Sequence, residues 1–248
     1  LIETTYRDVN IALANEYARY ADGHGLDVAA AIAAANTQPY SHIHTPGVGV
    51  GGHCIPVYPY FLMQGLLEVE LEQEEPQQSH LLLPRAARQI NDSMAEYAVQ
   101  RVEAEVGTLS GQAVLILGVT YRGGVRETAF TSAKLLLQAL SRHNAAVYVE
   151  DPLYSDVELR AMGYTPLPGG AEQDVQAIIL QSGHDMYTPA SFRAFSRCRV
   201  LLDGRRALDR EAIEALGIRY LAIGDGVKPR SVEEATATSP LARVGGNG

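Results

Sequence analysis

The chain has 248 residues, 46% hydrophobic and 20% charged, which is the composition of a folded globular protein with one large or two ordinary domains. Its formal net charge of −9 argues against nucleic acid as a partner, although local arginines can still bind a phosphate. No apolar run reaches membrane-spanning length, no stretch reads as a signal peptide, and the two cysteines suggest no disulfide framework. We therefore expect a cytoplasmic protein that binds neither a membrane nor a metal.

Residues 1–108 predict a helical region interrupted by one irregular loop. Apolar side chains recur at three- and four-residue steps, and Asp27 is placed to cap one of the helices. The predicted helices cover residues 1–22, 27–35, a short stretch from about residue 60, and 84–106. The irregular loop covers residues 36–59, and the acidic stretch 68–78 predicts a second, solvated loop.

Residues 109–234 change to alternating short apolar strands and helices. The predicted strands cover residues 113–118, 146–149, 177–180, 199–202 and 219–223, and the predicted helices cover 132–143, 155–162, 189–195 and 209–216. This alternation indicates an open parallel sheet with helices on both faces. The expected fold class is therefore α/β, a helical region followed by a Rossmann-like, doubly wound parallel-sheet domain.

The two ends of the chain carry a separate expectation. The first helix starts at Leu1 without a capping residue and the sequence has no initiator methionine, so we expect a fragment of a longer protein. Residues 235–248, which end in Gly-Gly-Asn-Gly, predict a flexible tail.

The most informative segment is Gly-Val-Gly-Val-Gly-Gly-His-Cys-Ile-Pro-Val-Tyr-Pro, residues 47–59. Its glycines let the backbone approach another group closely, and Cys54 follows them directly. A thiol beside such a bare backbone favours covalent chemistry on a bound carbonyl, whereas the plainer interpretation is a glycine-rich turn with a buried cysteine that only packs. Local features leave these two interpretations evenly balanced. Cys198, which precedes an apolar strand, is expected to be an inert core residue.

Gly47, Gly49 and Gly52 also match the Gly-x-Gly-x-x-Gly pattern of dinucleotide-binding turns. That pattern works only between a strand and a helix. Residues 38–46 do not read as a buried strand, and the Ile-Pro and Tyr-Pro pairs in residues 55–59 are not expected to begin a helix. We therefore predict no NAD site in this segment.

Polar residues follow the strands of the predicted sheet, at the edge where ligands bind in such folds. Arg122 follows the first strand and Arg205 follows the fourth. Two guanidinium groups on one rim suit bidentate binding of phosphate, so we predict an anion site there. The alternative is that each is a surface arginine in a loop.

Six segments together resemble the UDP-glucose/GDP-mannose dehydrogenase family, whose members oxidise nucleotide sugars at C6 to uronic acids. They are residues 6–16, 46–59, 88–94, 117–122, 150–152 and 203–205. Their order matches the family, and the resemblance covers nearly the whole chain. The Gly-Gly-His-Cys-Ile-Pro run favours the UDP-N-acetyl-D-mannosamine branch over the UDP-glucose branch.

The resemblance implies an NAD-dependent UDP-sugar 6-dehydrogenase of polysaccharide biosynthesis, with a Rossmann domain for NAD, a central helical dimerisation region and a C-terminal nucleotide-sugar domain. This chain would hold the last two in a homodimer. It would be inactive alone, because NAD would be bound mainly by the missing N-terminal domain.

The same resemblance assigns roles to residues. Cys54 would add to the C6 aldehyde as a thiohemiacetal, become a thioester after a second hydride transfer, and release the uronic acid on hydrolysis. The implied catalytic residues are Cys54 and Thr4. The implied substrate-binding residues are Gly47, Gly49, Gly51, Gly52, His53, Tyr58, Arg122 and Arg205.

Several positions depart from the family pattern. The catalytic lysine of the family would precede Leu1, and its asparagine partner falls on Thr4, whose hydroxyl can still donate. The family aspartate four residues after the cysteine falls on Tyr58, which cannot act as a carboxylate base. The usual lysine after the first C-terminal strand is Arg122, and a partner-subunit arginine of many members corresponds to Tyr40. These departures leave the particular UDP-sugar open.

Two hypotheses from other classes remain at this stage. Tyr58 and Thr4 favour a non-catalytic nucleotide-sugar-binding or scaffold protein derived from the family, whereas the retained cysteine and glycines oppose it. A cysteine hydrolase would need a base near the thiol, and His53 is adjacent while His42 and His44 are close in sequence. Adjacent side chains rarely face each other, so His53 is expected to pack in the loop or contact the sugar.

Overall fold

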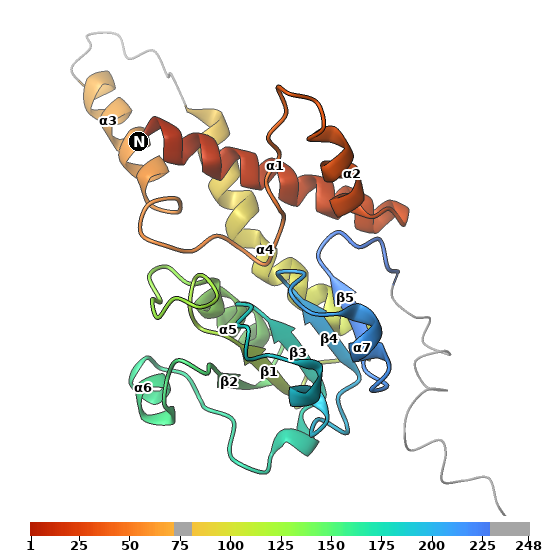
Figure 1. Cartoon of the computed structure of the whole chain (residues 1–248). Helices are drawn as coiled ribbons and strands as arrows, with labels where there is room; N and C mark the ends of the chain where they lie inside the picture. The colour runs from red at the N-terminus through yellow and green to blue at the C-terminus, as the bar shows by residue number, and fades with distance from the viewer. Residues whose placement is uncertain (72–80, 229–248) are drawn as a thin grey trace, which may run out of the picture.

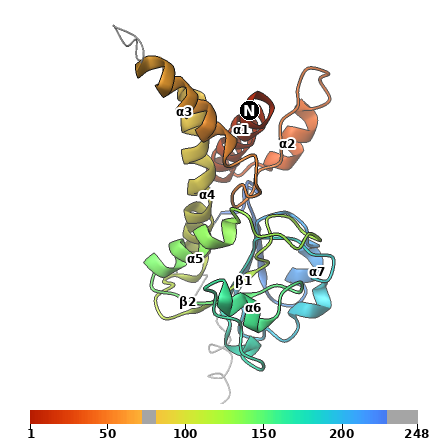
Figure 2. The same ribbon diagram turned by 90° about the vertical axis from the view of Figure 1, so that its left-hand side faces the viewer.

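The computed structural model describes residues 1–71 and 81–228. Figure 1 shows a group of helices above an α/β unit, and Figure 2 shows the same two parts after a quarter turn. The helices are α1 (Ile2–His24), α2 (Val28–Ala35), α3 (Tyr58–Leu71) and α4 (Leu82–Val106). Within the described ranges, no helix is both long and apolar enough to cross a bilayer. The predicted tail, 235–248, lies outside these ranges.

Local signals set the boundary between the first two helices. α1 is followed by Gly25 in the left-handed region at φ 71°, where glycine is favoured, and the Gly25 N–H donates to the carbonyl of Ala21. Asp27 accepts a hydrogen bond from the N–H of Ala29 and caps α2, as predicted. Local cap residues therefore mark this turn in the sequence.

The helix after the cysteine loop differs from the prediction. We expected the Tyr58-Pro59 pair to prevent a helix from starting there, but α3 begins at Tyr58. Proline is tolerated in a first turn because the N–H that it lacks would have no intrahelical acceptor. α3 continues to Leu71, so the predicted loop over 68–78 is wrong up to that residue, and 72–78 lie outside the described residues.

The α/β unit is built on five parallel strands in the order β2-β1-β3-β4-β5. The strands are β1 (Ala113–Leu117), β2 (Ala146–Glu150), β3 (Ala177–Leu180), β4 (Val200–Asp203) and β5 (Arg219–Ala222). The connections contain α5 (Ser132–Arg142), α6 (Asp156–Ala161), α7 (Arg210–Glu214) and the 3-10 helices η1 (Glu172–Asp174) and η2 (Pro189–Phe192). The winding reverses between β1 and β3, which makes that point the topological switch of the sheet.

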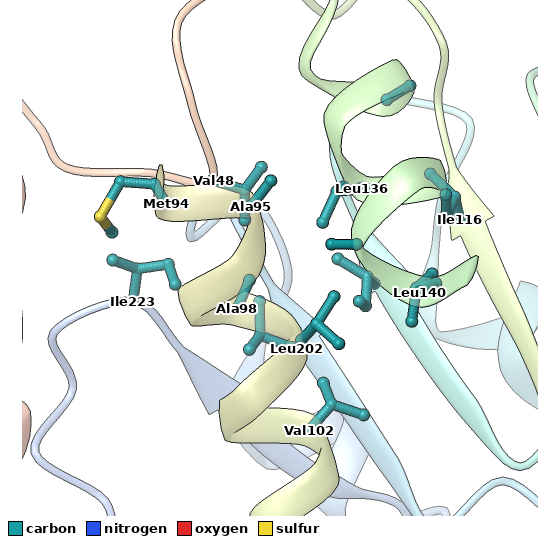
Figure 3. Packing of buried hydrophobic residues seen from close by; sticks show 14 of the residues in the cluster. Val48, Met94, Ala95, Ala98, Val102, Ile116, Leu136, Leu140, Leu202 and Ile223 are labelled. Carbon is teal, nitrogen blue, oxygen red and sulfur yellow. The ribbon is translucent and has the colours of Figure 1, made fainter. Parts of the chain in front are cut away.

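Helices cover both faces of the sheet, which confirms the predicted α/β class. On one face, Ala98 and Val102 of α4 pack beside Leu202 of β4, and Leu140 of α5 joins the same core (Figure 3). The other core lies under η2 and α7 and contains Phe192. α4 is thus both the last helix of the helical part and a cover of the sheet, so the two parts share one hydrophobic core.

A buried ion-pair network joins the helical part to the end of the edge strand β5. The Arg101 guanidinium on α4 donates to the Asp22 carboxylate at 2.8 Å and to the Asp225 carboxylate at 3.0 Å. It also donates to the carbonyls of Ala222 at 2.6 Å and Val227 at 2.9 Å. One cation therefore ties the end of α1 to the segment that leaves β5.

The Arg101→Met variant should lose stability by about 3–5 kcal/mol, because two buried carboxylates would each lose a charged partner. Denaturant unfolding measures this change. Arg142→Met is the matched control, because its ion pair with Glu96 is largely solvent-exposed and should contribute at most about 1 kcal/mol. Equal, small losses in both variants would contradict the structural role of Arg101.

Candidate functional site

The cysteine loop, residues 36–57, passes between the helices and the carboxyl edge of the sheet (Figure 1). Two asparagine side chains hold its first half. The Asn36 amide pairs with the N–H and carbonyl of Ile43 at 2.8 and 2.9 Å. The Asn10 amide on α1 accepts from the N–H of His44 at 2.9 Å and donates to the carbonyl of His42 at 2.6 Å. These amides hold the backbone in place without secondary structure.

The glycine-rich half of the loop is attached to a series of buried, hydrogen-bonded side chains between α1 and α4. The Gly47 N–H donates to the Asn15 side chain at 2.9 Å, and Asn15 donates to Asn91 at 2.9 Å. Asn91 donates to the Asp8 carboxylate at 2.8 Å, which also pairs with Arg88 at 2.6 Å. Burial raises the pKa of Asp8 although Arg88 opposes the shift. The loop is thus positioned by a hydrogen-bonded network of buried groups.

The glycines bring the loop backbone against the α/β unit. A Cβ on Gly49 would lie 2.6 Å from the Ser132 hydroxyl oxygen at the start of α5. A Cβ on Gly51 would lie 2.7 Å from the Cβ of Tyr121 in the loop after β1. Between the glycines, Val48 enters the shared core beside α4 (Figure 3). The glycines were expected to let the loop backbone approach another group closely, and the edge of the sheet is one such group.

A pocket of about 150 Å³ opens at this junction. It is lined by Ile11, Thr45, Gly47, Gly49, Val50, Gly51, Tyr121 and Arg205. The Arg205 guanidinium donates to the Gln181 carbonyl at 2.7 Å and to the Gly49 carbonyl at 3.3 Å. Burial lowers the pKa of Arg205 to about 10 although Asp203 acts in the opposite direction, so the side chain is still a cation at neutral pH. The pocket therefore presents a desolvated positive charge.

Cys54 lies just beyond the glycines and is exposed. Its carbonyl accepts from the N–H groups of Val57 and Tyr58 at 3.2 and 2.9 Å, in the turn that leads into α3. A hydrogen bond with the Cys54 side chain raises the pKa of the Tyr58 hydroxyl, which is therefore a donor at neutral pH. The interpretation of a buried packing cysteine is wrong for Cys54 and right for Cys198, which is 6% exposed.

His53 reaches across to the loop that follows β1. Its Nε2 atom lies 3.1 Å from the Glu127 carboxylate, and the neighbouring Gly52 N–H donates to the Ala129 carbonyl at 2.8 Å. Glu127 also accepts from the N–H groups of Thr128 and Ala129 at 2.8 and 2.9 Å. His53 and these N–H groups hold the pKa of Glu127 below its usual value. A fixed carboxylate thus orients the imidazole of the residue that precedes Cys54 in the chain.

The predicted site residues are only partly gathered together. Gly47, Gly49, Gly51 and Arg205 line one pocket. Tyr58 contacts Cys54, whereas His53 pairs with Glu127. The Thr4 hydroxyl donates to the Leu1 carbonyl of its own helix at 2.9 Å, and Arg122 is an exposed side chain in the loop after β1. Sequence reasoning missed Asn15, Tyr121 and Glu127. Their types are ordinary for a helix and a loop, so no local signal marks them.

The topological switch between β1 and β3 is closed by its own loops. A Cβ on Gly123 would lie 1.7 Å from the Gly183 carbonyl oxygen, so the two loops touch. Below them, His184 lies 3.2 Å from the Asp151 carboxylate and accepts from the Gly124 N–H at 3.2 Å. The Gly-x-Gly-x-x-Gly segment at 47–52 does not follow a strand. The residues that the structure describes therefore do not fit a dinucleotide cradle.

These parts define the fold of nucleotide-sugar dehydrogenases. The solved UDP-D-ManNAc dehydrogenase from Pyrococcus horikoshii matches with a TM-score of 0.71 and 30% identity, over 91% of this chain and 50% of that chain. The UDP-N-acetyl-D-mannosamine dehydrogenase of Methanocaldococcus jannaschii is 32% identical over 91% of this chain and 50% of its own length. A Methanococcus maripaludis protein of the same name is 38% identical over 91% of this chain and 51% of its own length.

A comparison with family models identifies one part of the chain more specifically. Residues 1–93 match the central domain of the UDP-glucose/GDP-mannose dehydrogenase family. Residues 1–93 therefore carry the central domain of this family, and the rest of the chain is similar to nucleotide-sugar dehydrogenases, as the sequence motifs had indicated. It spans about half the length of the curated relatives that it matches.

The two cysteines should differ sharply in reactivity. Burial raises the pKa of the Cys198 thiol to about 12, and its Sγ donates to the Val200 carbonyl, whereas Cys54 is exposed. Timed alkylation between about pH 7 and 9 should modify Cys54 first and leave Cys198 unmodified until the protein unfolds, because only the thiolate reacts. Peptide mass spectrometry reads both sites. Equal labelling rates would contradict the assignment.

Proposed function

We propose that the chain is the substrate-binding and thiol-bearing part of an NAD-dependent UDP-sugar 6-dehydrogenase. The enzyme oxidises C6 of UDP-N-acetylmannosamine or UDP-glucose to the uronic acid. The observation that carries this proposal is the exposed Cys54 thiol, which follows a glycine loop that is packed against Arg205 at the carboxyl edge of the sheet. The names of the similar proteins support the same substrate class.

Each group at the site then has a defined task. The Cys54 sulfur forms a covalent bond with the C6 carbonyl carbon, and the Tyr58 hydroxyl is hydrogen-bonded to the Cys54 side chain. Arg205 and Arg122 attract the diphosphate. NAD would be the hydride acceptor, and it would be bound outside the described residues, because these do not fit a dinucleotide. The chain of 248 residues is accordingly inactive alone.

One observation favours the second candidate, a non-catalytic nucleotide-sugar-binding or scaffold protein. The positions where the family carries an asparagine and an aspartate hold Thr4 and Tyr58, and the Thr4 hydroxyl is bonded to its own helix. Such a protein would bind UDP-sugars without oxidising them. Activity of the whole enzyme therefore separates the two candidates.

The test is NADH formation by the complete enzyme with a panel of UDP-sugars. We expect turnover with one of them, with two NADH formed per uronic acid. Cys54→Ser should abolish uronic acid production, because an oxygen adduct cannot become a thioester. Cys198→Ser is the matched control and should retain activity, since that thiol is buried away from the loop. Binding without NADH for every sugar would support the scaffold and overturn the dehydrogenase.

Binding of UDP to this chain tests the two arginines separately. Arg122→Ala removes one charge-assisted hydrogen bond, worth roughly 1.5–3 kcal/mol, so calorimetry should show about a tenfold loss of affinity or more, without loss of stability. Arg205→Ala should weaken both binding and stability, because its guanidinium also holds the Gly49 carbonyl. Arg197→Ala, whose exposed side chain pairs with Asp174, is the control. Unchanged affinity in Arg122→Ala would mean that Arg122 makes no contact with UDP.

The homodimer is also a proposal and rests on one face of α1. The exposed large apolar side chains of this helix are Ile2, Tyr6, Leu13, Tyr17 and Tyr20. They recur at helical spacing, so a second copy could cover them. Light scattering at roughly micromolar concentration should give a dimer that Tyr17→Lys disrupts and that Val157→Lys, on exposed α6, leaves intact. A monomeric parent chain would contradict this proposal.

A further inference from the structure

His53, the residue before the proposed nucleophile, has an imidazole that is held in one orientation. The Nε2 atom of His53 faces the Glu127 carboxylate at 3.1 Å. Glu127 is in turn fixed by the N–H groups of Thr128 and Ala129, and its pKa is low, so it is an ionised acceptor. Nε2 is therefore the ring nitrogen that donates to Glu127, and Nδ1 is the nitrogen that remains to accept a proton.

Other groups placed at the site lack this capacity. The Tyr58 hydroxyl is protonated and donates toward Cys54. Arg205 is a cation without a lone pair. His42 and His44 line a different pocket, with Glu3, Tyr6, Arg7 and Ile43. Among the residues described near Cys54, His53 is thus the group with both a free basic atom and a partner that orients it.

We propose that His53 is the general base that hydrolyses the Cys54 thioester, an inference that rests on the proposed function. Nδ1 takes a proton from a water molecule as the water oxygen adds to the thioester carbonyl carbon. The C–S bond then breaks, the imidazolium returns its proton to the sulfur, and the carboxylic acid loses its proton to solvent. This step replaces the carboxylate base that Tyr58 cannot provide.

The geometry suits a water molecule better than direct proton transfer from the thiol. Consecutive Cα atoms are about 3.8 Å apart, and neighbouring side chains diverge from the backbone, which leaves room for a bridging water. No hydrogen bond joins His53 to Cys54 within the described ranges, whereas both side chains are exposed to solvent. His53 is 66% exposed, so its substitution should leave the fold unchanged.

An activated ester tests this step in the chain itself, without NAD or a nucleotide sugar. Excess p-nitrophenyl acetate acetylates Cys54 and releases nitrophenolate, and hydrolysis of the acetyl thioester then limits turnover. The His53→Ala variant should keep the initial burst but lose about 10²-fold in deacylation rate, with acetylated Cys54 accumulating in intact mass spectra. Added imidazole should restore part of the rate, which a purely structural role of His53 would not allow.

Two variants complete the experiment. Glu127→Gln should slow deacylation in the same direction, because the amide no longer fixes the ring. His143→Ala removes an imidazole that pairs with Glu96 and Glu103 elsewhere and should change nothing. The proposal is overturned if acetylated Cys54 is equally stable in the parent and in His53→Ala, or if the burst slows as much as deacylation. Because no nucleotide sugar takes part, this outcome is independent of the dehydrogenase assay.

Discussion

In the segment 47–51, the lack of space for a side chain at the three glycines is the constraint on which the site depends. A Cβ at Gly47, Gly49 or Gly51 would lie 2.9 Å or less from an atom of the α/β unit. Contacts that close are not tolerated by real Cβ atoms, so larger residues would push the loop away from the sheet edge. Because Cys54 follows this segment directly, the glycines determine where the thiol stands relative to Arg205. The glycines thus position the loop because they have no side chain.

The same loop has a polar attachment on its other side. The Gly47 N–H ends a chain of buried side chains that runs through Asn15 and Asn91 to Asp8 and Arg88. A buried polar group that loses its partner costs free energy, so these hydrogen bonds couple the loop to the helix pair. The position of the loop therefore depends on the helix pair. The packing of the helix pair and the position of the loop depend on the same residues here.

Much of the fold could be predicted because its signals are local. The β3 boundaries, Ala177–Leu180, follow from an uninterrupted apolar run, and the Gly25–Asp27 turn follows from cap residues. The start of α3 was missed because proline was taken as a helix breaker, whereas the first turn accepts it.

The site was less predictable because its contacts span the chain. Cys54 and the glycines stand out by type, but the Arg205–Gly49 contact joins residues 156 positions apart, and the His53–Glu127 pair bridges two separate loops. Such pairs follow from strand order and loop path, which a single sequence does not contain. The closed switch point at Gly123 and Gly183 depends likewise on two loops meeting after the sheet has formed.

The Arg101 network has a mechanical consequence for the site. It fastens α1 and α4 to the end of β5, while the shared core under α4 fastens the same helices to the middle of the sheet. Attachments at two separated places prevent the helical part from swinging as a rigid body about a single hinge. A change in the opening of the Arg205 pocket then has to come from the loop, whose backbone is held by side-chain amides that can exchange their partners for water.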